Sequence, residues 1–280
     1  MLMLIKNIVF SGGNLKGLSF FGGIKYLKEK NLLNDLKHIA GTSVGAIVAF
    51  CLILEYNISD LEYLFSHLQL ENFNNINSDT ILHFFDNFGI DSGDKLFTIF
   101  KVLLKKKNIH EKTTMKQFYN IYKTKLTFVG CCLNTSKPVY FNVDNTPDIE
   151  ILKALRISYC IPFLYKPIKM DNYFYVDGGL VDNYCIELFE DELEHTLGFS
   201  VSNPDDHSDN IDSFESYFKK VLTTKFFNSS MNKALKYSKN TVYILIPIKS
   251  MDWNMTSKQK IELIDCGYVT TKLFFKSLQV

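Results

Sequence analysis

One serine stands between two glycines in the segment Ile39–Ile47, which reads IAGTSVGAI. An apolar stretch precedes this Gly-x-Ser-x-Gly motif and small apolar residues follow it, a pattern typical of a strand that turns sharply into a helix. In such a turn the side chain of Ser43 stands clear of the backbone and can act as a nucleophile, while Gly41 and Gly45 leave room for a substrate. Serine is also a common helix cap, so the motif alone leaves both interpretations open.

Two further glycine-rich segments could complete an active site. SGGNLKG (Ser11–Gly17) follows an apolar stretch and opens onto a helical pattern, so its successive N–H groups could bind a phosphate or the oxyanion of an acyl-transfer intermediate. Its spacing fits neither a Walker loop nor a dinucleotide-binding loop. VDGGL (Val176–Leu180) places Asp177 at the end of an apolar strand, where its carboxylate could project from the sheet edge. A tight turn is the plain alternative for each segment.

Taken together, the three segments supply the parts that nucleophilic ester chemistry needs: an oxygen nucleophile, a base and donors for the developing negative charge. His195 and His207 follow Asp177, as the histidine does in a conventional α/β-hydrolase. In that fold, however, the nucleophile turn comes after several strands, and here it comes after two. Neither histidine has a local signature, so a serine–aspartate dyad of Ser43 and Asp177 accounts better for the pattern.

The elements that must position these residues alternate from the start of the chain. The first 56 residues read strand, helix, strand, helix, which indicates a parallel sheet flanked by helices. The whole chain is interpreted as one domain over residues 1–280, with core motifs at about 7–190 and a C-terminal strand and helices within 210–280. The remaining predicted elements are mostly helix over Ser59–Lys107, paired strands in KLTFVGCCLN and KPVYFNV, a helix over Ile149–Ser158, strands in YFYVD, LGFSVS and TVYILIPI, and helices over Phe214–Tyr237 and Lys258–Leu278.

Composition narrows the class of protein. The chain has 280 residues, 46% hydrophobic and 22% charged, and a net charge of +1, which suits a large core and argues against a general nucleic-acid binder. No apolar run reaches the roughly 18 residues of a membrane span, and the N-terminus is interpreted as a strand instead of a signal peptide. Six scattered cysteines without a C-x-x-C pair indicate reduced thiols and an intracellular protein. A single arginine, Arg156, amid many Lys, Asn and Ile resembles AT-rich coding, as in some large viruses or intracellular parasites.

The order of the motifs resembles the patatin-like phospholipase family. A glycine-rich loop follows the first strand, Gly-x-Ser-x-Gly follows the second, and Asp-Gly-Gly lies far downstream. The resemblance extends over about Asn7–Leu273 and includes the block LRISYCIPFLYKPI before the Asp-Gly-Gly strand and LVDNYCIELF after it. It implies a three-layer α/β/α fold with a mainly parallel central sheet.

The resemblance also implies roles for individual residues. Ser43 would be the nucleophile and Asp177 its base, with no catalytic histidine. The supporting positions are the N–H groups of Gly12, Gly13 and Asn14 as the oxyanion hole, Lys16 and Gly17 in the same loop, Gly41 and Gly45 at the serine turn, and Gly178 and Gly179 beside the base. Lys16 would orient the loop or attract phosphate, with an ordinary surface lysine as the alternative. The chain departs from the family at Asn14, where a third glycine is common, and at Ser11, where an acidic residue is common.

The expected activity is hydrolysis of fatty-acyl esters of phospholipids, of the phospholipase A type, without metal or cofactor. Partial burial is expected to raise the pKa of Asp177 so that it can act as a base. A short-chain esterase or thioesterase, or a non-catalytic lipid binder, are the alternatives. Substrate would arrive from a membrane or micelle. The segments Lys95–Asn108 and Ser213–Phe227 mix aromatic residues with lysines and could lie on an anionic lipid surface, or could face the core with solvated lysines.

Overall fold

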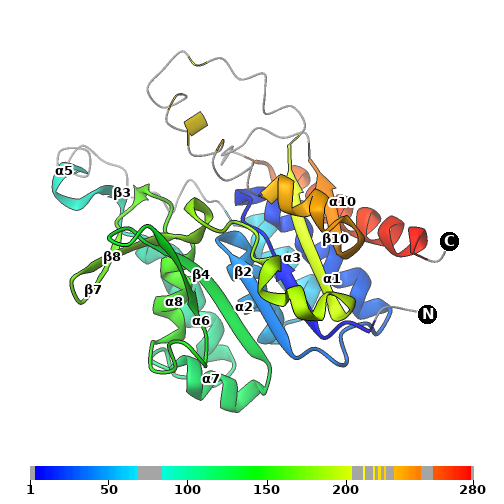
Figure 1. Ribbon diagram of the computed structural model, residues 1–280, viewed down its shortest axis with the longest axis horizontal. Coiled ribbons are helices and arrows are strands. Elements are labelled where there is room, and N and C mark those ends of the chain that lie inside the picture. The colour runs from blue at the N-terminus through cyan, green and yellow to red at the C-terminus, as the bar shows by residue number, and fades with distance from the viewer. Residues whose placement is uncertain are drawn as a thin grey trace.

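A computed structural model describes residues 4–68, 84–203, 230–246 and 255–278, together with residues 211, 217, 220, 221 and 224. Its centre is an eight-stranded sheet of order β10-β9-β1-β2-β4-β8-β7, with β5 beside β4 (Figure 1). The strands are β1 (Asn7–Phe10), β2 (His38–Thr42), β4 (Lys125–Cys132), β5 (Lys137–Phe141), β7 (Ile168–Met170), β8 (Tyr173–Asp177), β9 (Thr196–Ser202) and β10 (Thr241–Leu245).

The sheet is mainly parallel, as the sequence predicts. Strands β10, β9, β1, β2 and β4 run in one direction, whereas β5 and β8 are antiparallel to β4 and β7 is antiparallel to β8. The central strands are apolar on both faces because both faces are covered; every residue of β1 and β9 is buried. KLTFVGCCLN and KPVYFNV form the predicted pair of strands, β4 and β5, and this pair is antiparallel.

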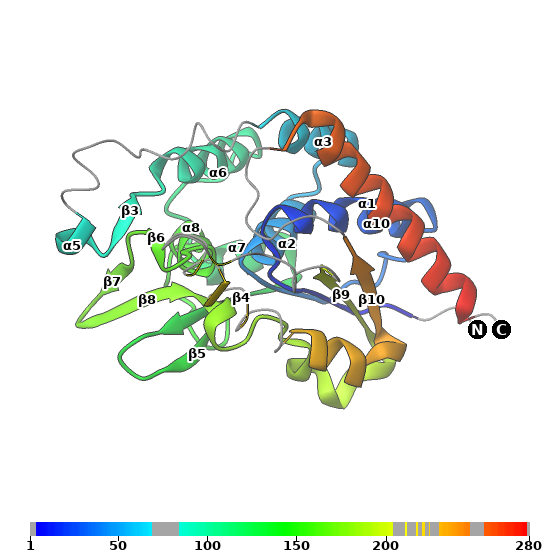
Figure 2. The same cartoon turned by 90° about the horizontal axis from the view of Figure 1, so that it is seen from above.

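Helices lie on both faces of this sheet (Figure 2). One face carries the larger core, and the other carries a smaller cluster that includes Tyr184, Phe189 and Tyr237. The architecture is therefore the three-layer α/β/α arrangement implied by the family resemblance. The helices are α1 (Ser19–Glu29), α2 (Val44–Ile53), α3 (Ile58–His67), α5 (Phe84–Asn87), α6 (Asp94–Lys106), α7 (Met115–Tyr122), α8 (Ile151–Ser158) and α10 (Ser257–Ser277), with short 3-10 helices η1 (Asn14–Leu18), η3 (Gly178–Leu180), η4 (Ile186–His195) and η5 (Ser238–Asn240).

The C-terminal helix α10 packs closely on α1. A Cβ atom added at Gly22 would lie 1.8 Å from the Ile264 carbonyl oxygen, and one added at Gly267 would lie 1.8 Å from the Ser19 carbonyl oxygen. Only glycine fits at such a crossing, so these two positions fix how near the helices approach. No helix in the described ranges is long and apolar enough to cross a membrane.

A small lobe projects beyond the β8–β7 edge of the sheet. It contains α5 and a separate two-stranded sheet in which β3 (Gly89–Asp91) runs parallel to β6 (Phe163–Tyr165) (Figures 1 and 2). The strand β3 interrupts the segment that was predicted to be mostly helical. Its three residues carry no alternating pattern, and it forms only by pairing with β6.

Other differences are confined to boundaries and to residues outside the described ranges. The strand β2 continues to Thr42, directly before Ser43. The helix α2 ends at Ile53, three residues before residue 56, where the predicted helix ends. Residues 230–236 are helical, but most of the predicted helix Phe214–Tyr237 lies outside the described residues. The six cysteines are free thiols, and five of them are buried.

Candidate active site

Ser43 occupies a strained turn between β2 and α2. Its backbone has φ 57° and ψ −123°, a conformation that a residue with a side chain rarely adopts. The Ser43 N–H donates to Ser158 Oγ at 3.1 Å, and Ser158 Oγ donates to the Val129 carbonyl oxygen at 2.7 Å. Ser158 therefore connects the turn to β4 and helps to hold the serine in this conformation.

The glycines of the motif allow close packing beneath the serine. A Cβ atom at Gly45 would lie 2.4 Å from the Phe10 carbonyl oxygen, and one at Gly41 would lie 2.3 Å from the Gly45 carbonyl oxygen. These neighbours are backbone atoms of β1 and of the turn itself, so a side chain at either position would force the turn apart. The side chain of Ser43 is 8% exposed.

Asp177 lies near the serine turn through the register of three strands. Asp177 of β8 is opposite Gly130 of β4, and the neighbouring Val129 is opposite Thr42, which directly precedes Ser43. The strand β8 runs antiparallel to β4. Asp177 therefore ends a strand whose direction is opposite to that of the central parallel strands. A Cβ at Gly178 would lie 2.5 Å from the Val129 carbonyl oxygen, which shows how tightly the chain passes here.

The carboxylate of Asp177 is buried with few partners. It is 1% exposed, and its Oδ1 accepts a hydrogen bond from the Gly179 N–H at 2.8 Å. Its Oδ2 has no hydrogen-bond partner among the described residues. Burial raises the pKa of Asp177 to about 7, and the hydroxyl of Ser43 and the N–H of Gly179 oppose that rise. The Ser43 hydroxyl is thus near enough to oppose the rise of the Asp177 pKa, although Oδ2 has no hydrogen bond of standard geometry, and such bonds often tighten only when substrate is bound.

The glycine loop runs beside the serine. A Cβ at Gly12 would lie 3.3 Å from Ser43 Cβ. Gly13 and Asn14 stand at the N-terminal end of η1, where N–H groups have no partner within the helix and can face an anion. Asn14 has φ 50°, a left-handed conformation that asparagine tolerates better than most residues.

Gly12 differs from the other two predicted donors. Its N–H donates to the Asn183 carbonyl oxygen at 2.9 Å, so in this arrangement it is engaged and cannot stabilise an oxyanion. The set of candidate donors is thereby reduced to Gly13 and Asn14. Sequence reasoning could not find this bond, because Asn183 lies in a distant segment.

Lys16 and Gly17 support the loop from within the protein. Lys16 is 3% exposed, which contradicts the alternative that it is an ordinary surface lysine. A Cβ at Gly17 would lie 2.4 Å from Val44 Cγ1, so this glycine allows η1 to lie against the first turn of α2. The loop and the serine turn are thus packed as one unit.

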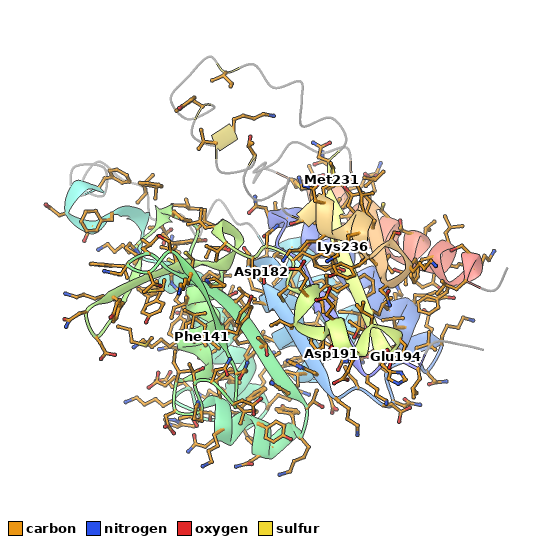
Figure 3. All side chains as sticks on the ribbon, viewed as in Figure 1. Phe141, Asp182, Asp191, Glu194, Met231 and Lys236 are labelled. Carbon is orange, nitrogen blue, oxygen red and sulfur yellow. The ribbon has the colours of Figure 1, made fainter. Side chains whose placement is uncertain are left out.

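The segment after Asp-Gly-Gly contains a second buried aspartate that the sequence analysis missed. Asp182 accepts hydrogen bonds from the Tyr140 hydroxyl and from Lys233 Nζ, both at 2.8 Å, and Lys233 also pairs with Glu187 at 2.9 Å. The Asp182 carbonyl oxygen accepts from Thr42 Oγ1 at 3.0 Å. Figure 3 labels Asp182 between the strands and the helical residues 230–236. The sequence signal for Asp182 is a polar pair, Asp-Asn, inside the otherwise apolar segment LVDNYC.

A cavity lined almost entirely by apolar side chains opens beside Ser43. Asn14, Ser43 and the phenol rings of Tyr159 and Tyr165 lie on it, and its apolar walls include Leu18, Ile47, Leu96 and Ile161. An apolar cavity that ends at a serine suits an ester with a hydrocarbon chain.

None of the described histidines lies in this site. His195 directly precedes the start of β9, at the end of the sheet opposite to Ser43, and its Nδ1 contacts the Leu4 carbonyl oxygen at 3.2 Å. His38, His67 and His110 do not line the cavity. His207 lies outside the described residues. Within the described ranges no group of His, Cys, Asp or Glu side chains is arranged to hold a metal ion, and metal independence stays a prediction.

Known proteins resemble the chain in sequence and in fold. The protein R571 of Acanthamoeba polyphaga mimivirus is 28% identical over 279 residues, covering 96% of this chain and 93% of that protein. The probable lipid hydrolase 463L of Invertebrate iridescent virus 6 is 30% identical over 185 residues, covering 65% of this chain and 62% of that protein. Both relatives come from large viruses, in agreement with the composition bias.

The solved structure of VipD from Legionella pneumophila has the same fold. It superposes with a TM-score of 0.65 at 16% identity, over 98% of this chain and 67% of that one. The family model described as patatin-like phospholipase matches residues 8–189, a range that contains the glycine loop, the serine turn and the Asp-Gly-Gly segment. The chain therefore belongs to the patatin-like phospholipase family, and this family and the relative described as a probable lipid hydrolase support lipid hydrolase activity.

Proposed function

We propose that this protein hydrolyses fatty-acyl esters of phospholipids, as a phospholipase A, through an acyl-enzyme on Ser43 with Asp177 as the base. The observation that carries the proposal is the state of Asp177. It is a buried carboxylate with a pKa of about 7 and one unpartnered oxygen, beside a serine in a strained turn that opens onto an apolar cavity. Such a carboxylate can both accept and return a proton near neutral pH.

The reaction would proceed in two steps. Asp177 takes the hydroxyl proton as Ser43 Oγ attacks the ester carbonyl, and the N–H groups of Gly13 and Asn14 stabilise the oxyanion, each by roughly 3–4 kcal/mol. Collapse of the intermediate breaks the ester bond, and Asp177 gives its proton to the departing alcohol oxygen of the lysolipid. Asp177 then takes a proton from water as the water oxygen attacks the acyl-enzyme carbonyl, and gives this proton to Ser43 Oγ as the acyl–oxygen bond breaks, which releases the fatty acid and restores the serine.

Two further proposals concern the extent of the domain and the source of the substrate. Residues 1–280 act as one domain, because β9 and β10 belong to the central sheet and α10 packs on α1. The substrate comes from a membrane surface, because phospholipids with long chains reside there. An intracellular location stays a prediction.

The test compares variants on vesicles of ester-labelled phosphatidylcholine. We expect Ser43→Ala and Asp177→Asn each to lower the rate about 10³-fold or more, and a fluorophosphonate probe to label the wild-type protein but not Ser43→Ala. Ser200→Ala is the matched control, because Ser200 is another buried serine, on β9, and its hydroxyl has no partner among the described residues. We expect this variant to keep full activity and labelling.

The other outcomes separate the alternatives. Labelling with hydrolysis of short-chain esters or thioesters alone would indicate the esterase. Absence of labelling together with lipid binding would indicate a non-catalytic binder. Full activity in Asp177→Asn would contradict the dyad.

A further inference from the structure

Four phenylalanines gather at the end of the projecting lobe. We call Phe84, Phe88, Phe163 and Phe174 the phenylalanine tip. The rings of Phe84 and Phe163 stack with centroids 6.4 Å apart, and those of Phe88 and Phe174 meet edge to face at 6.2 Å. The two pairs are neighbours, because Gly89, next to Phe88, is opposite Phe163 in the β3–β6 pairing. Phe88 is 56% exposed and Phe163 is 46% exposed.

The backbone at the two exposed rings is strained. Phe88 has φ 55° and Phe163 has φ 66°, the left-handed region that bulky residues rarely adopt. Glycine or asparagine would occupy these positions at lower free energy, so neither phenylalanine is favoured by its local backbone. Burial does not explain them either, since about half of each side chain is in water. Besides their contacts within the tip, Phe88 and Phe163 each expose about half of their surface, and such exposed apolar area can contact a surface outside the chain.

The phenylalanine tip is joined to the cavity beside Ser43. The Tyr165 N–H donates to the Ile161 carbonyl oxygen at 2.9 Å, which closes a turn with Phe163 at its apex. Ile161 and Tyr165 line the cavity, whereas Phe163 and Phe88 do not. An external surface in contact with Phe163, at the apex of this turn, would therefore lie next to the cavity wall.

Arg156 fixes the lobe to that wall. Its guanidinium lies 4.9 Å from the ring centroid of Tyr165 and 5.2 Å from that of Tyr159, and both rings line the cavity. Its Nη2 donates to the carbonyl oxygen of Ser92 at 2.8 Å, directly after β3. The lobe and the cavity are thus positioned together.

Charge around the tip is nearly balanced. Lys166 and Lys169 carry positive charge, Lys169 Nζ lies 5.8 Å from the ring centroid of Phe174, and Asp86 and Asp171 carry negative charge. Among the described residues these charges balance, so the exposed rings are the main feature that the tip presents to a partner surface. Aromatic side chains favour the headgroup region of membranes, where the ring meets hydrocarbon and its surroundings stay polar.

The helix α6, whose lysines were a sequence-based candidate for lipid contact, is oriented differently. Its apolar residues Leu96, Phe100, Leu103 and Leu104 are buried in the core, and Lys105 and Lys106 are exposed to solvent. This arrangement matches the alternative of a core-facing helix with solvated lysines. The other candidate segment, Ser213–Phe227, lies mostly outside the described residues.

We infer that the phenylalanine tip docks on a zwitterionic phospholipid surface and brings the cavity mouth to the substrate. The inference rests on the proposed function for its purpose, but binding can be measured without catalysis. The probe is a phosphatidylcholine vesicle, tested by flotation with Ser43→Ala protein, which cannot turn over lipid if Ser43 is the nucleophile. Binding should change little between low and high salt, because few charges are involved.

The decisive variant is Phe88→Asn together with Phe163→Asn. Asparagine accepts the left-handed backbone, so the rings are removed without new strain. We expect vesicle affinity to fall about tenfold or more, while hydrolysis of a soluble short-chain ester by the same variant with Ser43 intact changes less than about twofold. The matched control is Val269→Gln with Leu273→Gln, which removes two exposed apolar side chains from the outer face of α10 and should leave binding unchanged.

A second measurement does not depend on that variant folding. Phe163→Trp adds an indole to a chain with one native tryptophan, and its emission should shift to the blue when vesicles are added. Undiminished vesicle binding after loss of both rings, no emission shift, or binding only to anionic vesicles that is lost at high salt would each overturn the inference. Failure of Ser43→Ala to lose activity would instead contradict the proposed function and leave the binding result readable.

Discussion

Two buried aspartates lie five positions apart in the chain and have opposite surroundings. Asp182 accepts hydrogen bonds on both carboxylate oxygens, from Tyr140 and from Lys233. Asp177 accepts one bond from Gly179, and its other oxygen has no partner among the described residues. The paired carboxylate connects the sheet to the layer that carries Lys233, whereas the underpartnered one lies beside Ser43 with a pKa raised to about 7.

The difference teaches that partners, and not residue type or burial, separate a structural aspartate from a candidate base. A carboxylate that is fully hydrogen-bonded is stabilised as an anion and gains little from a proton. A buried carboxylate with few donors holds its proton more tightly, which is what a base for serine requires. Asp177 is the last residue of β8 and Asp182 follows five positions later, so the anchored aspartate lies close in the chain to the candidate base.

The largest expected effect is the contrast in activity between Asp177→Asn and Asp182→Asn. We expect Asp177→Asn to lower kcat/KM on a soluble ester about 10³-fold or more with little change in KM, because the base is lost. Asp182→Asn should lower kcat/KM less than about tenfold, because its carboxylate bonds to Tyr140 and Lys233, while its backbone carbonyl keeps the bond from Thr42. Steady-state kinetics on the two purified variants checks this, and equal losses would erase the distinction.

The next effect is on stability as a function of pH. Between about pH 4 and pH 7 Asp177 is protonated in the folded protein and ionised in the unfolded chain, so the folded state binds more protons. The free energy of unfolding therefore falls as pH rises through this window, by up to roughly 4 kcal/mol, and is constant above it. Asp177→Asn should lack this fall and exceed the wild type in stability at pH 7.5. Urea unfolding at pH 4.5 and 7.5 measures it, and Asp182→Asn, which keeps Asp177, should retain the fall.

A smaller effect is expected when the Asp182 contacts are broken. Lys233→Met should lower the free energy of unfolding by about 2 kcal/mol, because it leaves a buried carboxylate with one partner fewer. Asp182→Asn should lower the free energy of unfolding less in the Lys233→Met variant than in the wild type, because the two residues interact directly. A double-mutant cycle by urea unfolding tests this, and strict additivity would show that the pair contributes nothing.

The smallest effect concerns the glycine loop beside Ser43. Asn14 has a left-handed backbone, so Asn14→Gly should be tolerated with less than about twofold change in kcat and Asn14→Ala should cost about 1 kcal/mol of stability. Thermal unfolding and kcat of the two variants distinguish the backbone from the side chain. A large loss in Asn14→Gly would assign a role to the asparagine amide itself.

The candidate dyad could be predicted from the sequence because it rests on local signals. Ser43 and Asp177 each stand in a short glycine motif after an apolar strand, and the order of these motifs identifies the family. The central sheet followed from the same alternation. Lys16 was placed correctly in the loop, but its burial could not be read from its type.

The rest could not be predicted because it depends on contacts between distant segments. Asp182 meets Lys233 from 51 positions away, and Gly12 gives its N–H to Asn183 across 171 positions, with no pattern linking either pair. The antiparallel direction of β8 follows from its pairing and not from its composition. The left-handed backbone of Phe88 and Phe163 likewise could not be predicted from the sequence, because phenylalanine rarely adopts that conformation.

The rate at which a fluorophosphonate probe labels Ser43, followed from pH 5 to pH 9, tests the role of Asp177 most directly. The wild-type rate should rise about tenfold per pH unit at low pH and reach a plateau around an apparent pKa of about 7. Asp177→Asn should label slowly and without this step, whereas Asp182→Asn should keep it. A flat wild-type profile, or an unchanged step in Asp177→Asn, would contradict the account.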